Sequence, residues 1–476
     1  MDSSQVSPEN LPSFLESHRW LLDPRLEVCV VGSRALFEGC RRAGLPLPPE
    51  PVDLDLSWRL EPKKGREFLT DLGLEVSATQ GNEDRGTLAI QLSGHRVELT
   101  SYRGGGAETA ERVAQDGALR DMTIGAVYWK LWCDKIADPM GGLADWGVGL
   151  VRACGLSADR IQEHPIRALR YLRKTIELGF HLDTATRRGI EAQASFVGKA
   201  VLPEALAEEI RKVLARCTSP GAFFQLAWEV RLLDRILPEI APLFDGRPAG
   251  RILYHPEISQ ALHMILALRA AVDVASQEGL DLRERHLLLM AVLCHDLGKG
   301  NTQSSQLPSH PGHEAGGVEI IHSLFRRLPA LGNKYVERFC KVSARSHLLL
   351  NKLPMMRAGT LVDLWEQDFR GLESDYRNLA RVVRCDRDGR LRPAQIGIPC
   401  PEQIQAAPAG QALEDRIQAD LSTLDRCIRS VSGEASARLH PGDPQALKEH
   451  LRTARCEALA HSGFLDKKGR KQEGHP

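Results

Sequence analysis

Residues 291–300 read AVLCHDLGKG, a hydrophobic run that ends in the adjacent pair His295 and Asp296, with Lys299 close behind. Neighbouring side chains can reach one metal ion only where the backbone turns them toward the same point. An imidazole and a carboxylate together suit Mg²⁺, Mn²⁺, Ni²⁺ or Fe better than a structural zinc ion, which prefers thiolates. The dipeptide is common, so its meaning depends on the residues that accompany it.

Other histidines and a distant aspartate accompany this pair in a definite order. His263 precedes it, and Asp386 follows within the polar stretch RCDRDG at 384–389. Three more histidines lie between the pair and Asp386, namely His310, His313 and His347. A lone histidine on an apolar helix is usually a satisfied core residue, whereas this ordered set favours metal or phosphate chemistry. The order resembles that of the HD phosphohydrolase superfamily.

The composition indicates a globular chain of several domains. Of 476 residues, 42% are hydrophobic and 26% are charged, and the formal net charge is zero. No global field therefore points to nucleic acid, and any basic surface must be local. The 11 cysteines form no Cys-x-x-Cys pair, which predicts reduced thiols in a cytoplasmic protein. We find neither a secretory signal nor an apolar run of about twenty residues, so we expect no membrane span.

The N-terminal part alternates strands with helices, and the rest is helical. Residues 26–31 predict a buried strand that runs into Gly32, Ser33 and a helix over 35–43. Further strands are expected at 52–56, 87–92 and 96–102. Helices are expected at 163–178, 206–215, 222–236, 255–275, 284–295, 316–328, 411–431 and 444–461. A Pro- and Ala-rich linker over 393–408 separates the last two helices from the others, and the basic tail after 466 is either a solvated terminus or an RNA contact.

The segment around Gly32 has the features of a phosphate site. A glycine and a small hydroxyl residue between a strand and a helix let backbone N–H groups approach an anion. Asp53 and Asp55 follow about twenty residues later, and on a strand positions i and i+2 face the same way. Two carboxylates beside a triphosphate make a two-metal site, although Asp-x-Asp alone is usually a solvated strand edge. Glu98 is either a third acidic position or a surface carboxylate.

Together these elements resemble the nucleotidyltransferase superfamily of DNA polymerase beta and the poly(A) polymerases. Three further segments resemble motifs of class II tRNA nucleotidyltransferases: LRDMTIGA at 119–126, DPMGGLAD at 138–145 and EHPIRALR at 163–170. The resemblance extends over about 26–390. It is closest to bacterial class II CCA-adding enzymes that carry a fused HD phosphohydrolase domain.

This resemblance implies an α+β chain with a defined domain order. A nucleotidyltransferase head with a mixed sheet and helices would occupy 26–150, after an N-terminal extension over 1–25. An all-α neck and body at 151–250 would bind the nucleotide base and tRNA. An all-α HD metal-dependent phosphohydrolase domain would follow at 251–400, and a helical C-terminal extension with a basic tail at 401–476.

The resemblance also assigns roles in the first domain. Members of the family add C, C and A to tRNA 3′ ends from CTP and ATP, without a nucleic-acid template. The implied roles are Mg²⁺ binding and catalysis by Asp53 and Asp55, triphosphate binding by Gly32 and Ser33, and sugar or phosphate contact by Arg120 and Asp121. Base contact would come from Arg167 with His164, and Arg170 would also belong to the nucleotide site.

Several positions depart from the family pattern. The family has an aspartate where this chain has His164. A carboxylate only accepts hydrogen bonds, whereas a neutral imidazole has one donor and one acceptor, and a lost partner weakens the discrimination that a hydrogen-bonding pocket provides. His164 therefore either alters base selection or is a helix-terminal residue with no chemical role. The family asparagine is replaced by Gly125, and the loop between Tyr102 and Leu119 is short.

In the second domain the resemblance implies a divalent transition metal, such as Ni²⁺ or Mn²⁺, bound by His263, His295, Asp296 and Asp386. His310, His313 and His347 would surround the phosphate or a second ion. Lys299 is either a phosphate partner or a plain surface cation. The implied activities are 2′,3′-cyclic phosphodiesterase, 2′-nucleotidase and phosphatase.

The implied partners are tRNA, CTP and ATP, and the resemblance leaves a homodimer open. Three other readings remain. The chain could be a nucleotidyltransferase of relaxed specificity on another RNA, a phosphohydrolase whose N-terminal half only binds RNA, or a tRNA-binding chaperone without catalytic activity.

Overall fold

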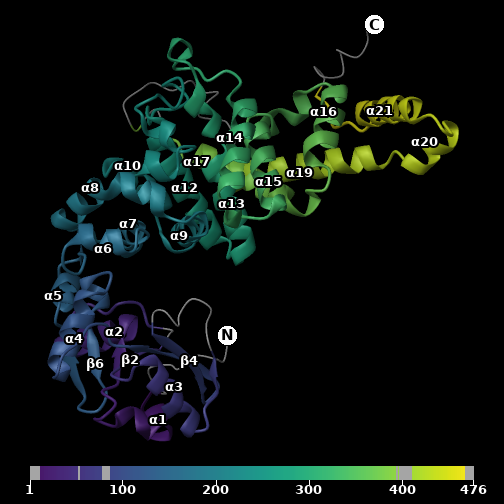
Figure 1. Ribbon diagram of the computed structural model, residues 1–476. Coiled ribbons are helices and arrows are strands. Elements are labelled where there is room, and N and C mark those ends of the chain that lie inside the picture. Colours follow the sequence, from purple (N-terminus) through teal and green to yellow (C-terminus); the bar gives the residue numbers. More distant parts are fainter. Residues whose placement is uncertain (1–10, 52–53, 78–85, 393–394, 396–409, 467–476) are drawn as a thin grey trace. The chain divides into compact units, whose positions relative to one another are not determined.

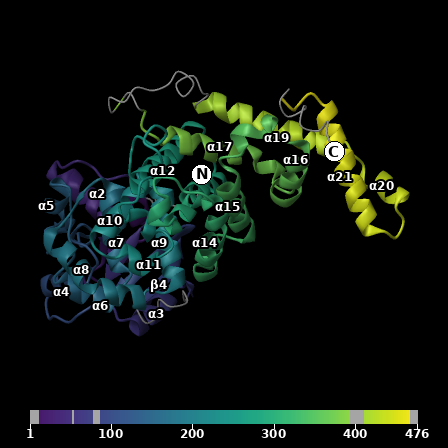
Figure 2. The same ribbon diagram turned by 90° about the horizontal axis from the view of Figure 1, so that it is seen from above.

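The computed structural model describes residues 11–51, 54–77, 86–392, 395 and 410–466. The chain forms two compact units, residues 1–200 and 201–476. The first unit combines a sheet with helices, and the described residues of the second are helices and loops (Figures 1 and 2). The expected α+β class is therefore confirmed, whereas the domain boundaries at 150, 250 and 400 stay predictions.

A seven-stranded sheet forms the core of the first unit. Its strands are β1 (Cys29–Val31), β2 (Asp55–Trp58), β3 (Val76–Ser77), β4 (Thr87–Leu92), β5 (His95–Ser101), β6 (Tyr128–Lys130) and β7 (Lys135–Ala137), in the order β3-β4-β5-β2-β1-β6-β7. Asp55 pairs with Val31 on one side and, in the parallel β2–β5 pair, with Glu98 on the other. Paired residues on neighbouring strands present their side chains to the same face, so Asp55 and Glu98 share one.

Helices cover both faces of this sheet, which explains the continuous apolar run at β1. Val30 packs in a cluster with residues of α2 (Gly32–Ala43) and α3 (Pro62–Asp71). Cys29 and Val31 pack instead with Val113 of α4 (Thr109–Ala118). Helices therefore cover β1 on both faces, and the turn at Gly32 directly follows this buried strand.

The remaining elements of the first unit include two longer helices, α7 (Arg167–Leu178) and α8 (Thr184–Ala200), and several short elements. The short elements include α1 (Leu11–Ser17), α5 (Gly142–Gly147), β8 (Leu150–Val151), α6 (Ser157–Glu163) and β9 (His181–Leu182). The single helix expected over 163–178 is wrong. His164 has extended backbone angles, φ −142° and ψ 94°, because the following Pro165 disfavours the helical conformation of the residue before it. The chain breaks there and α7 begins at Arg167.

The second unit packs its helices around α13 (Leu282–Cys294), whose residues Leu287–Cys294 are all buried. The other helices are α9 (Pro203–Arg216), α10 (Pro220–Glu229), α11 (Leu233–Ile236), α12 (Gln260–Gln277), α14 (His313–Arg327), α15 (Lys334–Ser346), α16 (Ala358–Leu364), α17 (Tyr376–Asp388), α19 (Gly410–Arg429), α20 (Gly433–Leu439) and α21 (Pro444–His461). Helices α12, α15 and α17 all contact α13. The end of α13, where His295 follows, therefore lies inside the bundle.

Two helix boundaries in the second unit differ from expectation. The helix expected from 255 begins at Gln260, because Ser259 caps it and Ile258 has a left-handed φ of 66°. The helix expected over 222–236 divides where Arg231 has φ 58°. Most of the linker over 393–408 and the whole basic tail lie outside the described residues. Among the described helices, none is both long and apolar enough to cross a membrane.

Candidate functional site

The turn between β1 and α2 brings a glycine against a carboxylate. Gly32 adopts φ +67°, and a Cβ placed on it would lie 3.3 Å from Oδ2 of Asp55. The left-handed conformation favours glycine. Because Gly32 has no side chain, the first turn of α2 lies close beside the Asp55 carboxylate. Glu98 faces the same way from β5 but also forms an ion pair with Arg96, at 3.0 Å. Asp53 lies outside the described residues.

A cavity of about 540 Å³ opens at this turn. Gly32, Ser33, Arg120 and Asp121 line it, together with the Pro48–Pro51 loop. The structure thus gathers four of the expected nucleotide-binding residues around one space. His164, Arg167 and Arg170 are not among the residues that line it.

Arg120 is fixed by a buried hydrogen-bond network. Its Nε donates to Tyr128 Oη (2.8 Å) and Asp116 Oδ2 (3.1 Å), and its Nη2 donates to Ser57 Oγ (3.0 Å). Burial opposes ionisation of Asp116, but Arg120, Tyr128 and Arg103 outweigh it and hold the pKa of that carboxyl below its ordinary value. The guanidinium is therefore pre-positioned at the cavity wall.

Asp121 connects the cavity to α7. Its Oδ1 accepts a hydrogen bond from Arg167 Nε (2.5 Å), and its Oδ2 accepts one from Arg170 Nη1 (2.6 Å). Burial raises the pKa of Asp121, and the two guanidinium groups more than compensate, so the pKa is lowered. The two arginines thus fix the position of Asp121 at the cavity wall.

Arg167 and His164 are separated by the helix break. The Arg167 side chain is 3% exposed, and it also donates to Glu163 Oε2 (2.9 Å) and to the carbonyl of Leu119 (3.0 Å). His164 is exposed at the end of α6. Base contact by these two residues stays a prediction.

Two cavity residues were missed by the sequence reasoning. Lys174 and Glu177, one helical turn apart on α7, line the cavity and form an ion pair at 2.9 Å. The helical spacing from Arg170 was the available signal, because i+4 and i+7 positions share a helix face. They add a donor and an acceptor to the wall opposite α2.

The second candidate site gathers the predicted histidines and aspartates inside the helical unit. His263 comes from α12, His295 and Asp296 directly follow α13, His313 begins α14, His347 follows α15, and Asp386 lies on α17. Asp296 is central, with His295 Nε2 at 3.3 Å, His313 Nε2 at 3.4 Å and His263 Nε2 at 3.5 Å from its oxygens. Asp386 Oδ1 lies 3.1 Å from His263 Nε2. His347 Nε2 is 3.8 Å from Asp296 Oδ1.

The orientation of these groups fits a divalent metal. The Nδ1 atoms of His295, His313 and His347 contact backbone carbonyls at 2.7–2.9 Å, which directs each Nε2 inward, as in metal sites. The Nε2 atoms of His263, His295 and His313 and the Oδ1 of Asp296 are buried with no hydrogen-bond partner among the described residues. Burial without partners is costly, so these donor atoms fit metal ions that would satisfy them.

The charges in this cluster are suited to cation binding. Burial opposes ionisation of Asp296, but Lys299 and His295 hold its pKa well below the ordinary value. Arg390 and His263 do the same for Asp386 against its burial. Burial lowers the pKa of His347 to about 4, which keeps its imidazole neutral. Asp296 outweighs burial and raises the pKa of both His295 and His313, so these two imidazoles would release their protons on binding a metal. The ionised carboxylates and the neutral His347 are already in the forms that ligate metals.

Lys299 and His310 hold the wall of the site. Lys299 Nζ donates to the Ala249 carbonyl (2.9 Å) and lies 2.8 Å from Asp296 Oδ2. His310 contacts the Pro248 carbonyl through Nε2 and Thr302 Oγ1 through Nδ1, both at 2.8 Å. Lys299 is 5% exposed, so it is a buried group and not a plain surface cation. Both ring nitrogens of His310 have hydrogen-bond partners, whereas among the described residues only the Nδ1 atom of His313 has one.

A cavity of about 420 Å³ opens onto this cluster. Asp296, Lys299, His313, His347, Asp386 and Arg390 line it. Arg390 Nη2 lies 2.5 Å from Asp386 Oδ2. The cavity, which Arg251 also lines, therefore presents possible metal ligands beside three cationic groups, an arrangement that suits a phosphate ester.

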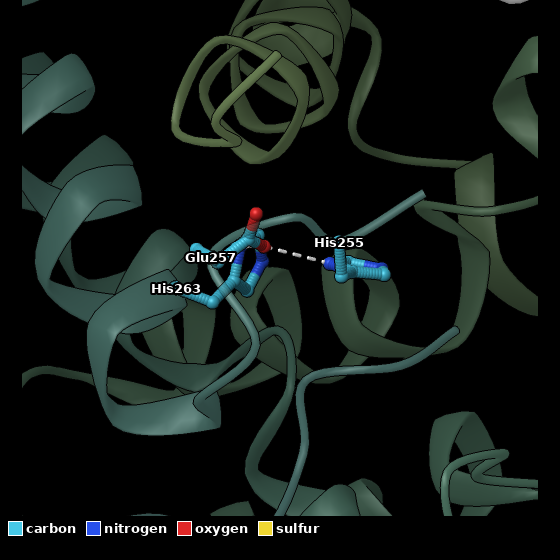
Figure 3. A group of neighbouring side chains, drawn as sticks. All are labelled: His255, Glu257 and His263. Carbon is cyan, nitrogen blue, oxygen red and sulfur yellow. Dashed lines mark hydrogen bonds and ion pairs between the residues drawn. The ribbon is translucent and has the colours of Figure 1, made fainter. Parts of the chain in front are cut away.

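Sequence reasoning missed Glu257 and the role of its neighbour His255. Glu257 Oε1 lies 2.9 Å from Nδ1 of His255 and 3.0 Å from Nδ1 of His263 (Figure 3). Burial opposes its ionisation, and the two histidines outweigh burial and lower the pKa of Glu257 to about 2. The available signal was an acidic residue shortly before a predicted metal ligand, the usual partner of a ligating histidine.

Comparison with known proteins identifies the family of the chain. The HD domain family matches residues 261–383. The multifunctional CCA protein of Burkholderia pseudomallei strain 1106a is 31% identical over 361 residues, which cover 73% of this chain and 78% of that protein. The multifunctional CCA protein of Burkholderia cenocepacia strain HI2424 is likewise 31% identical, with the same two coverages over 362 residues.

Solved structures share the fold. A CCA-adding enzyme in complex with CTP matches with a TM-score of 0.61 at 15% identity, over 98% of this chain and 94% of that one. The Thermotoga maritima CCA-adding enzyme complexed with tRNA matches with a TM-score of 0.58 at 15% identity, over 98% and 95% of the two chains. At this identity the likeness concerns the fold alone. The sequence relationship to the Burkholderia proteins goes further, and the chain belongs to the family of the multifunctional CCA proteins, with an HD domain in its second unit.

Proposed function

We propose that this enzyme adds C, C and A to the 3′ ends of tRNA from CTP and ATP, and that its HD domain hydrolyses phosphate esters at RNA ends. The observation that carries the first activity is the close approach to the Asp55 carboxylate of Gly32, which lines the 540 Å³ cavity. The family membership supports the same activity.

The residues of the first cavity divide the work of nucleotidyl transfer. Backbone N–H groups at the start of α2 would bind the triphosphate beside Ser33, and Arg120 would neutralise its charge. Asp55, with Asp53, would hold Mg²⁺. Mg²⁺ bound there would stabilise the charge that develops on the attacking hydroxyl and the leaving pyrophosphate.

The HD cavity would hold a divalent transition metal such as Ni²⁺ or Mn²⁺ through His263, His295, Asp296 and Asp386. A second ion would find donors in His313, His347 and the other oxygen of Asp296, which supports the larger set of ligands that the sequence suggests. Such ions would act as Lewis acids toward the phosphate and its attacking water. Lys299 and Arg390 would orient the phosphate by charge. The candidate activities are those of a 2′,3′-cyclic phosphodiesterase, a 2′-nucleotidase and a phosphatase.

Nucleotide incorporation tests the first activity directly. The purified full-length chain is incubated with Mg²⁺, a tRNA that lacks CCA and each labelled nucleoside triphosphate, separately and in combination. We expect addition from CTP, then one addition from ATP, and none from UTP or GTP. Hydrogen-bonding pockets of this kind discriminate strongly between bases.

A transferase of relaxed specificity is the alternative that the geometry keeps open. Arg167 is nearly inaccessible and already bound to Asp121, and His164 replaces a carboxylate. Addition from all four triphosphates would establish this alternative. Absence of any addition would instead reject nucleotidyl transfer on tRNA.

Replacement of Gly32 by alanine should impair addition beyond its effect on stability. The left-handed backbone costs a non-glycine residue about 1–2 kcal/mol of unfolding free energy, and the new Cβ would also press on Asp55 Oδ2. Displacement of that carboxylate should lower the rate of addition by about a hundredfold. Denaturant unfolding and the incorporation assay measure the two effects.

Gly44→Ala is the matched control. Gly44 has φ +65°, and a Cβ on it meets nothing within 4 Å. It should lose a similar unfolding free energy and keep full addition. Equal addition by the two variants would contradict the role given to the Gly32 turn.

A further inference from the structure

Glu257 is a buried carboxylate shared by two histidines of the HD domain. Its side chain is fully buried, and the loop that carries it precedes α12. Oε1 contacts Nδ1 of His255 and Nδ1 of His263, as described above, and Oε2 accepts the backbone N–H of Leu391 at 3.3 Å. One carboxylate therefore forms a hydrogen bond with His255, which lines the cavity, and lies at ion-pair distance from His263, a proposed metal ligand.

The contact with Glu257 fixes the tautomer of His255. A carboxylate can only accept a hydrogen bond, so the proton of a neutral His255 ring lies on Nδ1. Nε2 then carries a lone pair and is an acceptor. No hydrogen-bond partner of His255 Nε2 occurs among the described residues.

The position of the ring is enforced by its surroundings. A Cβ on Gly250 would lie 2.6 Å from His255 Cδ2, so the ring occupies the space that the missing side chain leaves. The backbone N–H of His255 donates to the carbonyl of Arg251 at 3.0 Å. His255 is thus held from two directions at the cavity wall, with its side chain 12% exposed.

The acceptor differs in kind from the cations around it. Arg251, Lys299 and Arg390 line the same cavity and are donors suited to phosphate oxygens. The lone pair on His255 Nε2 can instead accept a hydrogen bond from a hydroxyl group of the ligand. Tyr254, 51% exposed at the cavity, offers an aromatic surface against which a base can stack.

We propose that His255, held by Glu257, accepts a hydrogen bond from the free ribose hydroxyl next to a phosphate monoester and so selects ribonucleotide monoester ends in the HD cavity. A 2′,3′-cyclic phosphate has no such hydroxyl, so the contact concerns the 2′-nucleotidase activity. This inference rests on the phosphohydrolase function proposed above. His255 is then a specificity-determining residue, and Glu257 is a positioning residue that serves both the substrate contact and His263.

A pair of substrates that differ only in this hydroxyl tests the contact. Phosphate release by the full-length chain with Ni²⁺ is measured for adenosine 2′-phosphate and for 3′-deoxyadenosine 2′-phosphate. The wild type should prefer the first in kcat/KM by about tenfold, the effect of one hydrogen bond. His255→Ala should abolish the preference, because it should lower kcat/KM for adenosine 2′-phosphate about tenfold more than kcat/KM for the deoxy compound. His255→Gln, whose amide oxygen also accepts, should retain part of it.

Calorimetric titration of the metal-free full-length chain with the same two compounds gives a second readout that needs no turnover. The affinity ratio should follow the same pattern across the variants. His255→Ala that slows both substrates equally, or that keeps the preference, would overturn the inference while the hydrolase stands. Release from neither compound by the wild type would remove the proposed hydrolase and this inference with it.

Two positioning variants separate the contributions of the ring and the carboxylate. Gly250→Ala should displace the His255 ring and reduce the preference without changing metal affinity. Glu257→Gln should reduce both the preference and the metal affinity, the latter by at least about tenfold, as measured by equilibrium dialysis. Ser276→Ala, an exposed change on α12, should change neither. Unchanged preference in both positioning variants would refute the positioning role.

Discussion

Asp55→Asn should reduce CCA addition by about a thousandfold, which is the size of effect that removal of a pre-organised electrostatic group produces. Asparagine keeps the shape of the side chain and removes its charge, and Asp55 is exposed at the start of β2. The fold should therefore survive the change. The rate of single-turnover incorporation from CTP measures the loss.

Two controls test whether the loss of addition is specific to the Asp55 site. Asp71→Asn alters an exposed carboxylate at the end of α3 and should leave addition unchanged. Phosphate release by the HD domain of Asp55→Asn should equal that of the wild type, because Asp55 lies in the first unit and the HD cluster in the second. Full addition by Asp55→Asn would reject the two-carboxylate site. Absence of addition by the wild type would instead favour a chain whose N-terminal half only binds RNA.

Glu98→Gln decides between the two readings of the residue that faces Asp55 across β2 and β5. A third acidic position predicts a loss of similar size to that of Asp55→Asn. A surface strand carboxylate, already paired with Arg96, predicts little change. The same incorporation assay distinguishes the two outcomes.

The elements that the sequence predicted well are those with a strong local signal. The strand expected at 87–92 matches β4, because its residues are apolar and β-favouring. The turn at Gly32 followed from a small residue between an apolar run and a helix, and the structure gives it φ +67°. In both cases the decisive physics lies within a few residues.

Helix boundaries were missed where a single residue overrides periodicity. The apolar pattern continues through 163–178, but Pro165 ends α6 before Arg167 begins α7. Likewise the pattern before α12 looked helical, while Ser259 caps the helix and leaves His255 on a loop. Both signals were present in the sequence, and the periodicity concealed them.

The partners of the site residues that lie far away in the sequence could not be predicted from it. Glu257 meets Leu391, 134 residues later, and Asp121 meets Arg167 across 46 residues. Such contacts depend on how helices pack, and a spacing rule carries no information about them. The order of His and Asp residues predicted a ligand set, whereas the contacts of Glu257 with Leu391 and of Asp121 with Arg167 became visible only in the fold.

Asp296→Asn should eliminate phosphohydrolase activity and most metal binding. The Nε2 atoms of His263, His295 and His313 all lie within 3.5 Å of an Asp296 oxygen. An amide at this position removes the negative charge that lies between the proposed ligands. Loss of a group that supports a metal ligand lowers metal affinity by up to about a hundredfold. Because Asp296 is itself a proposed ligand, we expect its replacement to lower the affinity by at least that factor. Equilibrium dialysis with Ni²⁺ and Mn²⁺ measures it.

The same change should also lower stability in the metal-free protein. Lys299 Nζ lies 2.8 Å from Asp296 Oδ2, and both side chains are buried. Removing one partner of a buried ion pair leaves an uncompensated charge and costs about 3–5 kcal/mol of unfolding free energy. Asp273→Asn, an exposed change on α12, is the matched control for both metal binding and stability.

Chelation of the wild type separates loss of the metal from loss of the fold, because it leaves the sequence intact. Phosphate release should disappear after dialysis against a chelator and return when Ni²⁺ or Mn²⁺ is added. Asp296→Asn should not recover under the same treatment, while its CCA addition with Mg²⁺ stays at the wild-type rate, since that site belongs to the other unit. Persistent phosphate release by the chelated wild type, or by Asp296→Asn, would mean that hydrolysis does not depend on these ligands. The cluster around Asp296 would then be a buried polar core in which the unsatisfied Nε2 atoms serve no metal.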